Sequence, residues 1–198
     1  MLELLAPAGN LDAVIAAVQN GADAVYMGFG DGFNARRSAD NFTRESFAKA
    51  VRYCHIRGCK VYVTLNTLVG DREMEAAAAL AQQASDAGAD AILVQDLGLA
   101  RVLRDALPDI PLHASTQMSI HNLAGVEAAA EMGITRAVLA RELSLEQIRF
   151  ISQHASIETE VFVHGALCFC YSGQCYMSAL IGRRSGNRGA CAQPCRMQ

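Results

Sequence analysis

Five of the seven cysteines of this 198-residue chain lie within its last 31 residues. Cys168, Cys170 and Cys175 fall within eight positions, and Cys191 and Cys195 follow near the end. Thiolates held by glycine-rich turns suit zinc or an iron–sulfur cluster, whereas a single activated thiol would suit nucleophilic catalysis. The spacing favours a metal over a nucleophile or inert thiols. It matches neither the paired CxxC of zinc ribbons nor the ferredoxin pattern, so both metals stay open.

The segment that carries these cysteines is basic. Residues 161–198 contain four Arg and no Asp or Glu, although the whole chain has a net charge of −3. The segment is either a solvated basic loop or a surface that faces an anion, such as a substrate, RNA phosphates or a metal–thiolate cluster. The net negative charge argues against a protein that simply coats nucleic acid.

The composition is that of a globular domain, with 52% hydrophobic and 19% charged residues. The longest uninterrupted apolar run has six residues, at 76–81. A membrane span needs roughly 20, so no membrane association is expected. The first residues lack the basic stretch of a secretory signal. We therefore expect a cytoplasmic protein, whose thiols stay reduced.

Short apolar segments alternate with amphipathic helical patterns along the chain. Strands are expected at residues 3–7, 22–28, 60–66, 89–96, 111–116, 136–140 and 158–165, and helices near 10–20, 43–57, 71–87, 97–106, 121–132 and 144–154. Repeated βα units give a parallel sheet with outer helices. The pattern predicts an α/β fold, an incomplete TIM-type (β/α)8 barrel of about seven strands in residues 1–167. A Cys-rich segment, 168–198, follows in place of an eighth unit. An open doubly wound sheet is the alternative.

Polar residues recur where the predicted strands end, which is where βα-barrel enzymes place their chemistry. The candidates for catalysis are His164, Glu142, Asn66 and Gln117, and those for substrate binding are Asn34, Arg36, Gln95 and Arg188. All the strand-end candidates are expected to share one cavity. Structural alternatives stay open: Asn66 as a loop hydrogen bonder, Glu142 as an ion pair or cap, and residues 28–42 as a surface loop. Cys54 and Cys59 are expected to be packed as small hydrophobes.

Several motifs together identify a resemblance. EVFVHGALC at 160–168 and GQCYMS at 173–178 resemble the cysteine signature of the peptidase U32 family. LAPAGN, GADAVYMG, HASTQMS, LARELSLEQI and NRGACAQPCR resemble other blocks of that family, so the similarity covers essentially the whole chain. FNARR, VTLNTLVGDRE and VQDLGLA are most similar to its long branch, which is associated with ribosomal RNA hydroxylation.

The resemblance implies a function and a cofactor. Better-understood members are oxygen-independent hydroxylation proteins that act on transfer RNA, large-subunit ribosomal RNA or the ubiquinone ring, and the RNA-modifying branches are linked to prephenate. They carry a 4Fe–4S cluster, whose ligands match Cys168, Cys175 and Cys191 here. The family's fourth ligand lies outside this chain, and Cys195 is a possible substitute. We expect the three matched sulfurs to converge near the barrel mouth and Cys170 to point away.

Three functions therefore compete. The first is an iron–sulfur-dependent RNA hydroxylation enzyme that binds RNA, with a small anion as a further candidate ligand. The second is a peptidase, as the family name says, for which Cys168 with His164 is the conceivable nucleophile and base. The third is a zinc-stabilised scaffold without catalysis.

Overall fold

A computed structural model describes residues 2–30, 32–35, 41–165 and 168–196. Seven strands form one sheet in chain order, and each pairs in parallel with the next. They are β1 (Leu5–Pro7), β2 (Ala24–Met27), β3 (Lys60–Leu65), β4 (Ala91–Val94), β5 (Leu112–Ala114), β6 (Arg136–Val138) and β7 (Glu158–Glu160). β1 and β7 form the two edges of this sheet. The predicted incomplete barrel is confirmed.

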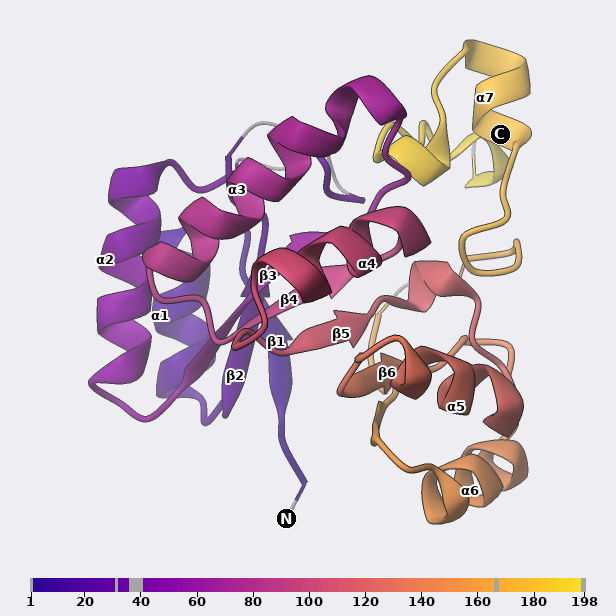
Figure 1. Ribbon diagram of the computed structural model, residues 1–198, viewed down its shortest axis with the longest axis horizontal. Coiled ribbons are helices and arrows are strands. Elements are labelled where there is room, and N and C mark those ends of the chain that lie inside the picture. The colour runs from indigo at the N-terminus through magenta and orange to yellow at the C-terminus, as the bar shows by residue number, and fades with distance from the viewer. Residues whose placement is uncertain (1, 31, 36–40, 166–167, 197–198) are drawn as a thin grey trace.

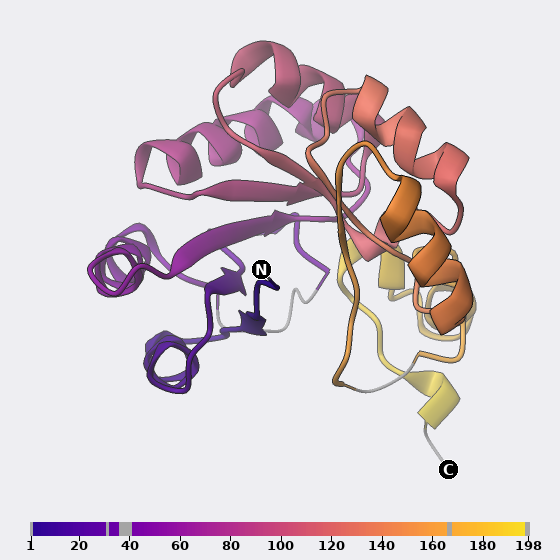
Figure 2. The same ribbon diagram turned by 90° about the horizontal axis from the view of Figure 1, so that it is seen from below.

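The helices lie in an arc around the outer face of the curved sheet (Figure 2). They are α1 (Leu11–Gln19), α2 (Arg44–His55), α3 (Met74–Asp86), α4 (Leu97–Ala106), α5 (Leu123–Glu131) and α6 (Leu145–His154). Five of them begin after a residue whose side chain accepts a hydrogen bond from the backbone N–H three positions on: Asn10, Thr43, Asp96, Asn122 and Ser144. Such caps fix where each helix starts and hence how each strand end is oriented.

Both faces of the sheet are buried over most of β2 to β6, whereas the edge strands β1 and β7 are partly exposed. This burial explains why the central strands read as continuous apolar runs. In β3, Val61, Val63 and Leu65 pack in the clusters between sheet and helices. Tyr62 belongs instead to the cluster inside the barrel, with residues such as Leu93 and Val138. The alternation follows from the two-residue period of a strand. Cys54 and Cys59 are buried in the core between sheet and helices, as predicted.

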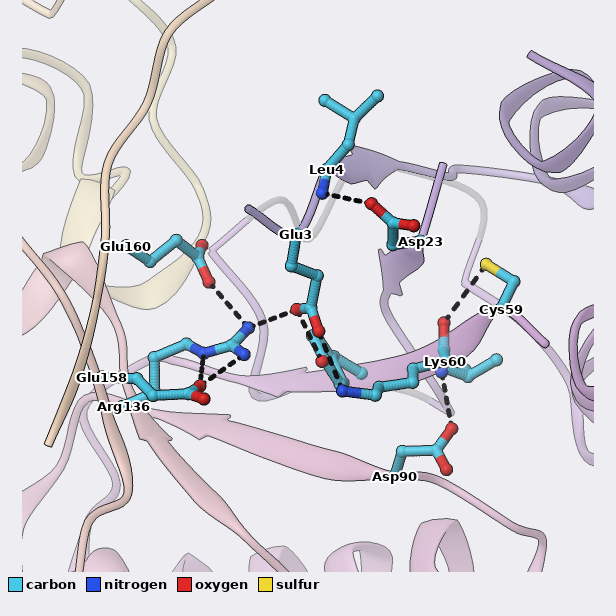
Figure 3. A network of polar contacts seen from close by, with 11 residues as sticks. Glu3, Leu4, Asp23, Cys59, Lys60, Asp90, Arg136, Glu158 and Glu160 are labelled. Carbon is cyan, nitrogen blue, oxygen red and sulfur yellow. Dashed lines mark hydrogen bonds and ion pairs between the residues drawn. The ribbon is translucent and has the colours of Figure 1, made fainter. Parts of the chain in front are cut away.

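A polar network fills the end of the barrel at which the strands begin (Figure 3). Arg136 on β6 donates to Glu3 and to Glu158 over 2.6 Å each, and it lies 3.5 Å from Glu160. Glu3 also accepts hydrogen bonds from Lys60, at 2.9 Å. Because Glu3 precedes β1 and Glu158 lies on β7, Arg136 joins the two edges of the sheet.

The end of the chain departs from the expected elements. β7 has three residues instead of eight, and Phe162 and Val163 beyond it are exposed. A short helix that was not expected, α7 (Met177–Gly182), lies in the Cys-rich segment. Figure 1 shows this segment, in yellow, on the side toward which the strand arrows point. No helix within the described ranges has both the length and the apolar character that crossing a bilayer requires.

Candidate functional site

Three neighbouring strands end in neutral hydrogen-bonding side chains. Leu65, Val94 and Ala114 are paired across β3, β4 and β5, so the next residues, Asn66, Gln95 and Ser115, follow at one level. Asn66 donates from Nδ2 to Ser115 Oγ over 3.2 Å and accepts the backbone N–H of Ala35 at Oδ1 over 2.9 Å. Gln95 is 6% exposed, and its Oε1 has no hydrogen-bond partner among the described residues. Sequence reasoning found Asn66 and Gln95 but not the hydrogen bond that Asn66 makes to Ser115.

The loop after β2 packs onto these strand ends. Asn34 is buried and donates from Nδ2 to Asn41 Oδ1 over 2.7 Å. A Cβ atom on Gly28 would lie only 2.8 Å from Asn34 Nδ2, so glycine permits this close approach. Asn34 therefore shapes the loop through its own hydrogen bonding. Arg36, the other predicted binding residue of the loop, lies outside the described residues.

Ser172 lies in the middle of the first cysteine group, residues 168–175, which we call the cysteine turn. Its hydrogen bonds attach this turn to the residues that follow β5 and β6. Ser172 is 1% exposed. Its backbone N–H donates to Glu142 Oε1 over 3.0 Å, and its hydroxyl lies 3.2 Å from the same oxygen. Arg141 donates to the Ser172 hydroxyl over 3.3 Å. Glu142 was predicted to act in catalysis, but these contacts indicate that it anchors the cysteine turn.

The backbone of Gln117 also contacts the cysteine turn. Gly173 has a φ of +73°, and a Cβ atom there would overlap the carbonyl group of Gln117. The turn thus lies directly against the short helical turn Thr116–Met118 that follows β5. A side chain at position 173 would push the cysteine turn off the strand ends.

A second attachment point holds the other cysteine group. Arg188 donates to both carboxylate oxygens of Glu73, over 2.7 and 2.5 Å, and to the carbonyl of Leu68 over 2.6 Å. The hydrogen bond from Arg188, together with the backbone N–H of Gly70, lowers the pKa of Glu73 to about 2. Arg188 was predicted to bind substrate. Its guanidinium is instead occupied by a bidentate ion pair with Glu73, which fixes the turn at residues 185–190.

The predicted catalytic residues do not all meet. His164 lies four residues beyond the end of β7 and is exposed, because β7 stops before it can carry the side chain to the strand ends. Asn66 and Gln95 lie together, whereas Gln117 and Glu142 border the cysteine turn. A cavity of about 290 Å³ is lined by Leu97, Met118 and other residues of α4, α5 and their neighbours, and it includes none of the predicted site residues.

The first three thiols are neighbours. Burial raises the pKa of Cys170, and the adjacent thiol of Cys175 and the nearby Cys168 raise it further. The expectation that Cys170 points away from the other two is therefore wrong. Cys191 directly follows the turn at residues 185–190, and its sulfur accepts the backbone N–H of Gln193 over 3.4 Å.

The donor chemistry suits iron or zinc, but the arrangement does not. All seven cysteines are free thiols. Across the described ranges, no three His, Cys, Asp or Glu side chains are placed to hold one metal ion. The predicted convergence of Cys168, Cys175 and Cys191 is absent from this conformation. The first two belong to the turn that Ser172 anchors, and the third follows the turn at residues 185–190 that Arg188 anchors.

The fold and these strand-end features place the chain in a known class. A parallel sheet in chain order with outer helices is a TIM-like half-barrel. The solved structure of the U32 peptidase Mk0906 shares it, with a TM-score of 0.70 and 17% identity, over 85% of this chain and 71% of that one. The family model for peptidase family U32 matches residues 9–198. The chain belongs to this family.

Two curated relatives are similar over nearly all of the chain. The 23S rRNA 5-hydroxycytidine C2501 synthase of Escherichia coli K12 is 46% identical over 99% of this chain and 29% of its own length. The tRNA hydroxylation protein P1 of Bacillus subtilis 168 is 41% identical over 98% of this chain and 46% of its own. The chain thus spans less than half the length of either relative.

Proposed function

We propose that this chain is the barrel part of an RNA hydroxylation enzyme, with large-subunit ribosomal RNA as the first substrate to test and transfer RNA as the second. The observation that carries the proposal is the 46% identity, over 99% of this chain, to a protein named as a 23S rRNA 5-hydroxycytidine synthase. The resemblance in FNARR and VQDLGLA favours the same branch. A cytoplasmic location, where the RNA is, belongs to the proposal.

The strand ends support a role in holding a base. Asn66 and Ser115 are fixed by their mutual hydrogen bond, and Gln95 presents an acceptor beside them. Carboxamides and hydroxyls of this kind recognise the donors and acceptors on the edge of an unstacked base. RNA-modifying enzymes commonly work on a base that has left its stack. The chain's own residues would thus bind and orient the base.

An iron–sulfur requirement, independence from oxygen and the use of prephenate are finer parts of this proposal. They rest on the family resemblance and on the five thiols near the strand ends. Because the described thiols are not gathered around one point, no chemical step is assigned to a cluster. Iron and sulfide analysis after anaerobic purification tests this part. Zinc in place of iron would favour the scaffold alternative.

The peptidase alternative lacks support from the site. Covalent catalysis by cysteine needs a base within hydrogen-bonding reach of the thiol. His164 and Cys168 are both exposed, and no hydrogen bond joins them in the described part of the chain. The neutral side chains at the strand ends offer no activated nucleophile either.

The decisive test is chemical analysis of RNA. The gene is deleted in its host, and ribosomal and transfer RNA are digested to nucleosides for mass spectrometry. Loss of a nucleoside that carries one added oxygen, and its return when the gene is restored, is the expected result. Unchanged nucleosides in both RNA classes would refute the proposal. Hydrolysis of collagen-derived peptides by the purified protein would favour the peptidase instead.

A further inference from the structure

Three large aromatic side chains are exposed on the first cysteine turn. Phe169 is 86% exposed, Tyr171 71% and Tyr176 65%. We call residues 168–176 the aromatic turn. Exposed apolar side chains that gather in one short segment mark an interaction site more often than a chance surface. The question is which kind of partner these rings fit.

The aromatic turn is held in place at its centre. Ser172 is buried and is bonded to Glu142 and Arg141, and Gly173 lies against the Gln117 carbonyl. The rings beside this anchor are therefore presented from a fixed base. A preorganised surface loses little conformational freedom when a partner binds, which favours affinity.

Positive charge follows the aromatic turn directly. Tyr176 precedes α7, and Arg183 and Arg184 follow it, so about 9 Å of helix separates the ring from the first guanidinium-bearing residue. Both arginines are exposed, and Arg184 donates from Nε to the carbonyl of Ala190 over 3.1 Å. No Asp or Glu occurs in residues 161–198 to offset this charge.

We infer that the aromatic turn and Arg183–Arg184 form a docking surface for single-stranded RNA beside the strand ends. The inference rests on the proposed function and extends it to a surface outside the Asn66–Gln95–Ser115 cluster. Bases stack on exposed aromatic rings irrespective of sequence, while arginines neutralise the backbone phosphates. Such a surface would hold the strand next to the base that enters the barrel mouth.

A protein partner is the competing occupant. Leu180 and Ile181 on α7 are 82% and 72% exposed and would suit an aliphatic interface. The positive charge and the three rings favour RNA, because exposed arginines gain more from neutralising a phosphate backbone than from an aliphatic protein surface. The experiment separates the two partners.

The test measures binding of a fluorescein-labelled, single-stranded RNA of mixed sequence by fluorescence anisotropy. Tyr171→Ala and Tyr176→Ala should each weaken binding about tenfold, the loss of one stacked base. Phe150→Ala on α6 is the matched control, since that ring is 53% exposed but lies beside Glu146, and it should bind as wild type. Thermal unfolding confirms that each variant is folded.

The charge component has its own measurement. Arg183→Gln should flatten the slope of log affinity against log salt concentration by about 0.7, as expected for one phosphate contact with a single strand. Arg149→Gln on α6 should leave the slope unchanged. An RNA duplex of the same sequence should bind more weakly than the single strand, because its bases cannot stack on the rings.

The outcomes are distinct. If Tyr171→Ala and Tyr176→Ala bind RNA as tightly as Phe150→Ala, the inference is wrong. It is equally wrong if these variants change only the oligomeric state in analytical ultracentrifugation, which would assign the surface to a protein partner. Ring-dependent RNA binding without any hydroxylated nucleoside would retain the docking surface and refute the proposed function. If Tyr171→Ala still hydroxylates RNA with an unchanged KM, the proposed function would stand and the docking surface would be refuted.

Discussion

Lowering the pH should destabilise this protein through one buried histidine, whose pKa is lowered in the folded state. His113 on β5 is 4% exposed, and its ring packs edge-on against Tyr62 at 4.9 Å between centroids. Within the described ranges, its Nδ1 has no hydrogen-bond partner. Burial lowers the pKa of His113 to about 3, and the nearby charge of Arg136 acts in the same direction while that of Glu3 opposes it.

The sign and size follow from linkage. The unfolded chain accepts a proton on His113 near its ordinary pKa of about 6.5, but the folded chain does not. Stability is therefore complete above about pH 6.5 and falls as the pH is lowered toward 3. Moving from about pH 7.5 to about pH 5.5 should cost about 1.3 kcal/mol of unfolding free energy from this residue. Glu3 does not interfere, because its pKa of about 2 confines its loss of stability to below about pH 4.5.

Urea unfolding at the two pH values measures this effect. His113→Gln cannot take up the proton, so its stability should fall by about 1.3 kcal/mol less than that of wild type over the same interval. His154→Gln, on exposed α6, serves as the control and should lose stability as wild type does. If His113→Gln and wild type lose equal amounts, the buried neutral histidine is not the cause and the reasoning fails.

Three further predictions concern the attachments of the chain. Arg188→Ala should speed hydrogen–deuterium exchange at residues 185–190. Arg101→Ala, which removes an exposed ion pair on α4, should not. If the two variants exchange equally at these residues, the Arg188–Glu73 ion pair does not hold the turn. Gly173→Ala should displace the aromatic turn, because the added Cβ would overlap the Gln117 carbonyl. The displacement should be seen as faster hydrogen–deuterium exchange at residues 168–176, and unchanged exchange would contradict this contact. Glu3→Gln should lower the unfolding free energy by about 1–3 kcal/mol in urea titrations, since it leaves the buried guanidinium of Arg136 with less countercharge. An unchanged unfolding free energy would show that the two carboxylates on β7 are enough to balance the charge of Arg136.

The sheet was predictable because its signals are local. Each βα unit has its own apolar run, five of the six helices start at a side-chain cap, and four of them end near a glycine with positive φ. Right-handed crossovers leave few ways to join such units. Asn10 and Ser144 cap helices close to where the pattern predicted a start. Cys54 and Cys59 could be assigned to the core because they flank the end of a helix that must pack on the sheet.

The roles of the polar residues were less predictable because their partners are distant in sequence. Glu142 binds Ser172, 30 residues later, and Arg188 binds Glu73, 115 residues earlier. No local pattern reveals such a partner, so both residues were expected to be available for chemistry or substrate. The shortness of β7 was missed for a similar reason. An apolar run such as Val161–Val163 extends as a strand only if a neighbour pairs with it.

The order of the strands has a consequence for how the chain folds. Every strand pairs with the one before it, so the sheet can grow unit by unit as the chain leaves the ribosome, with each step closing only a short loop. The hydrogen bond between Arg136 and Glu3 is different, because it spans 133 positions. It forms only after six strands are in place, which makes it a late event in folding. Mutations at Glu3 should therefore speed unfolding while leaving the folding rate almost unchanged.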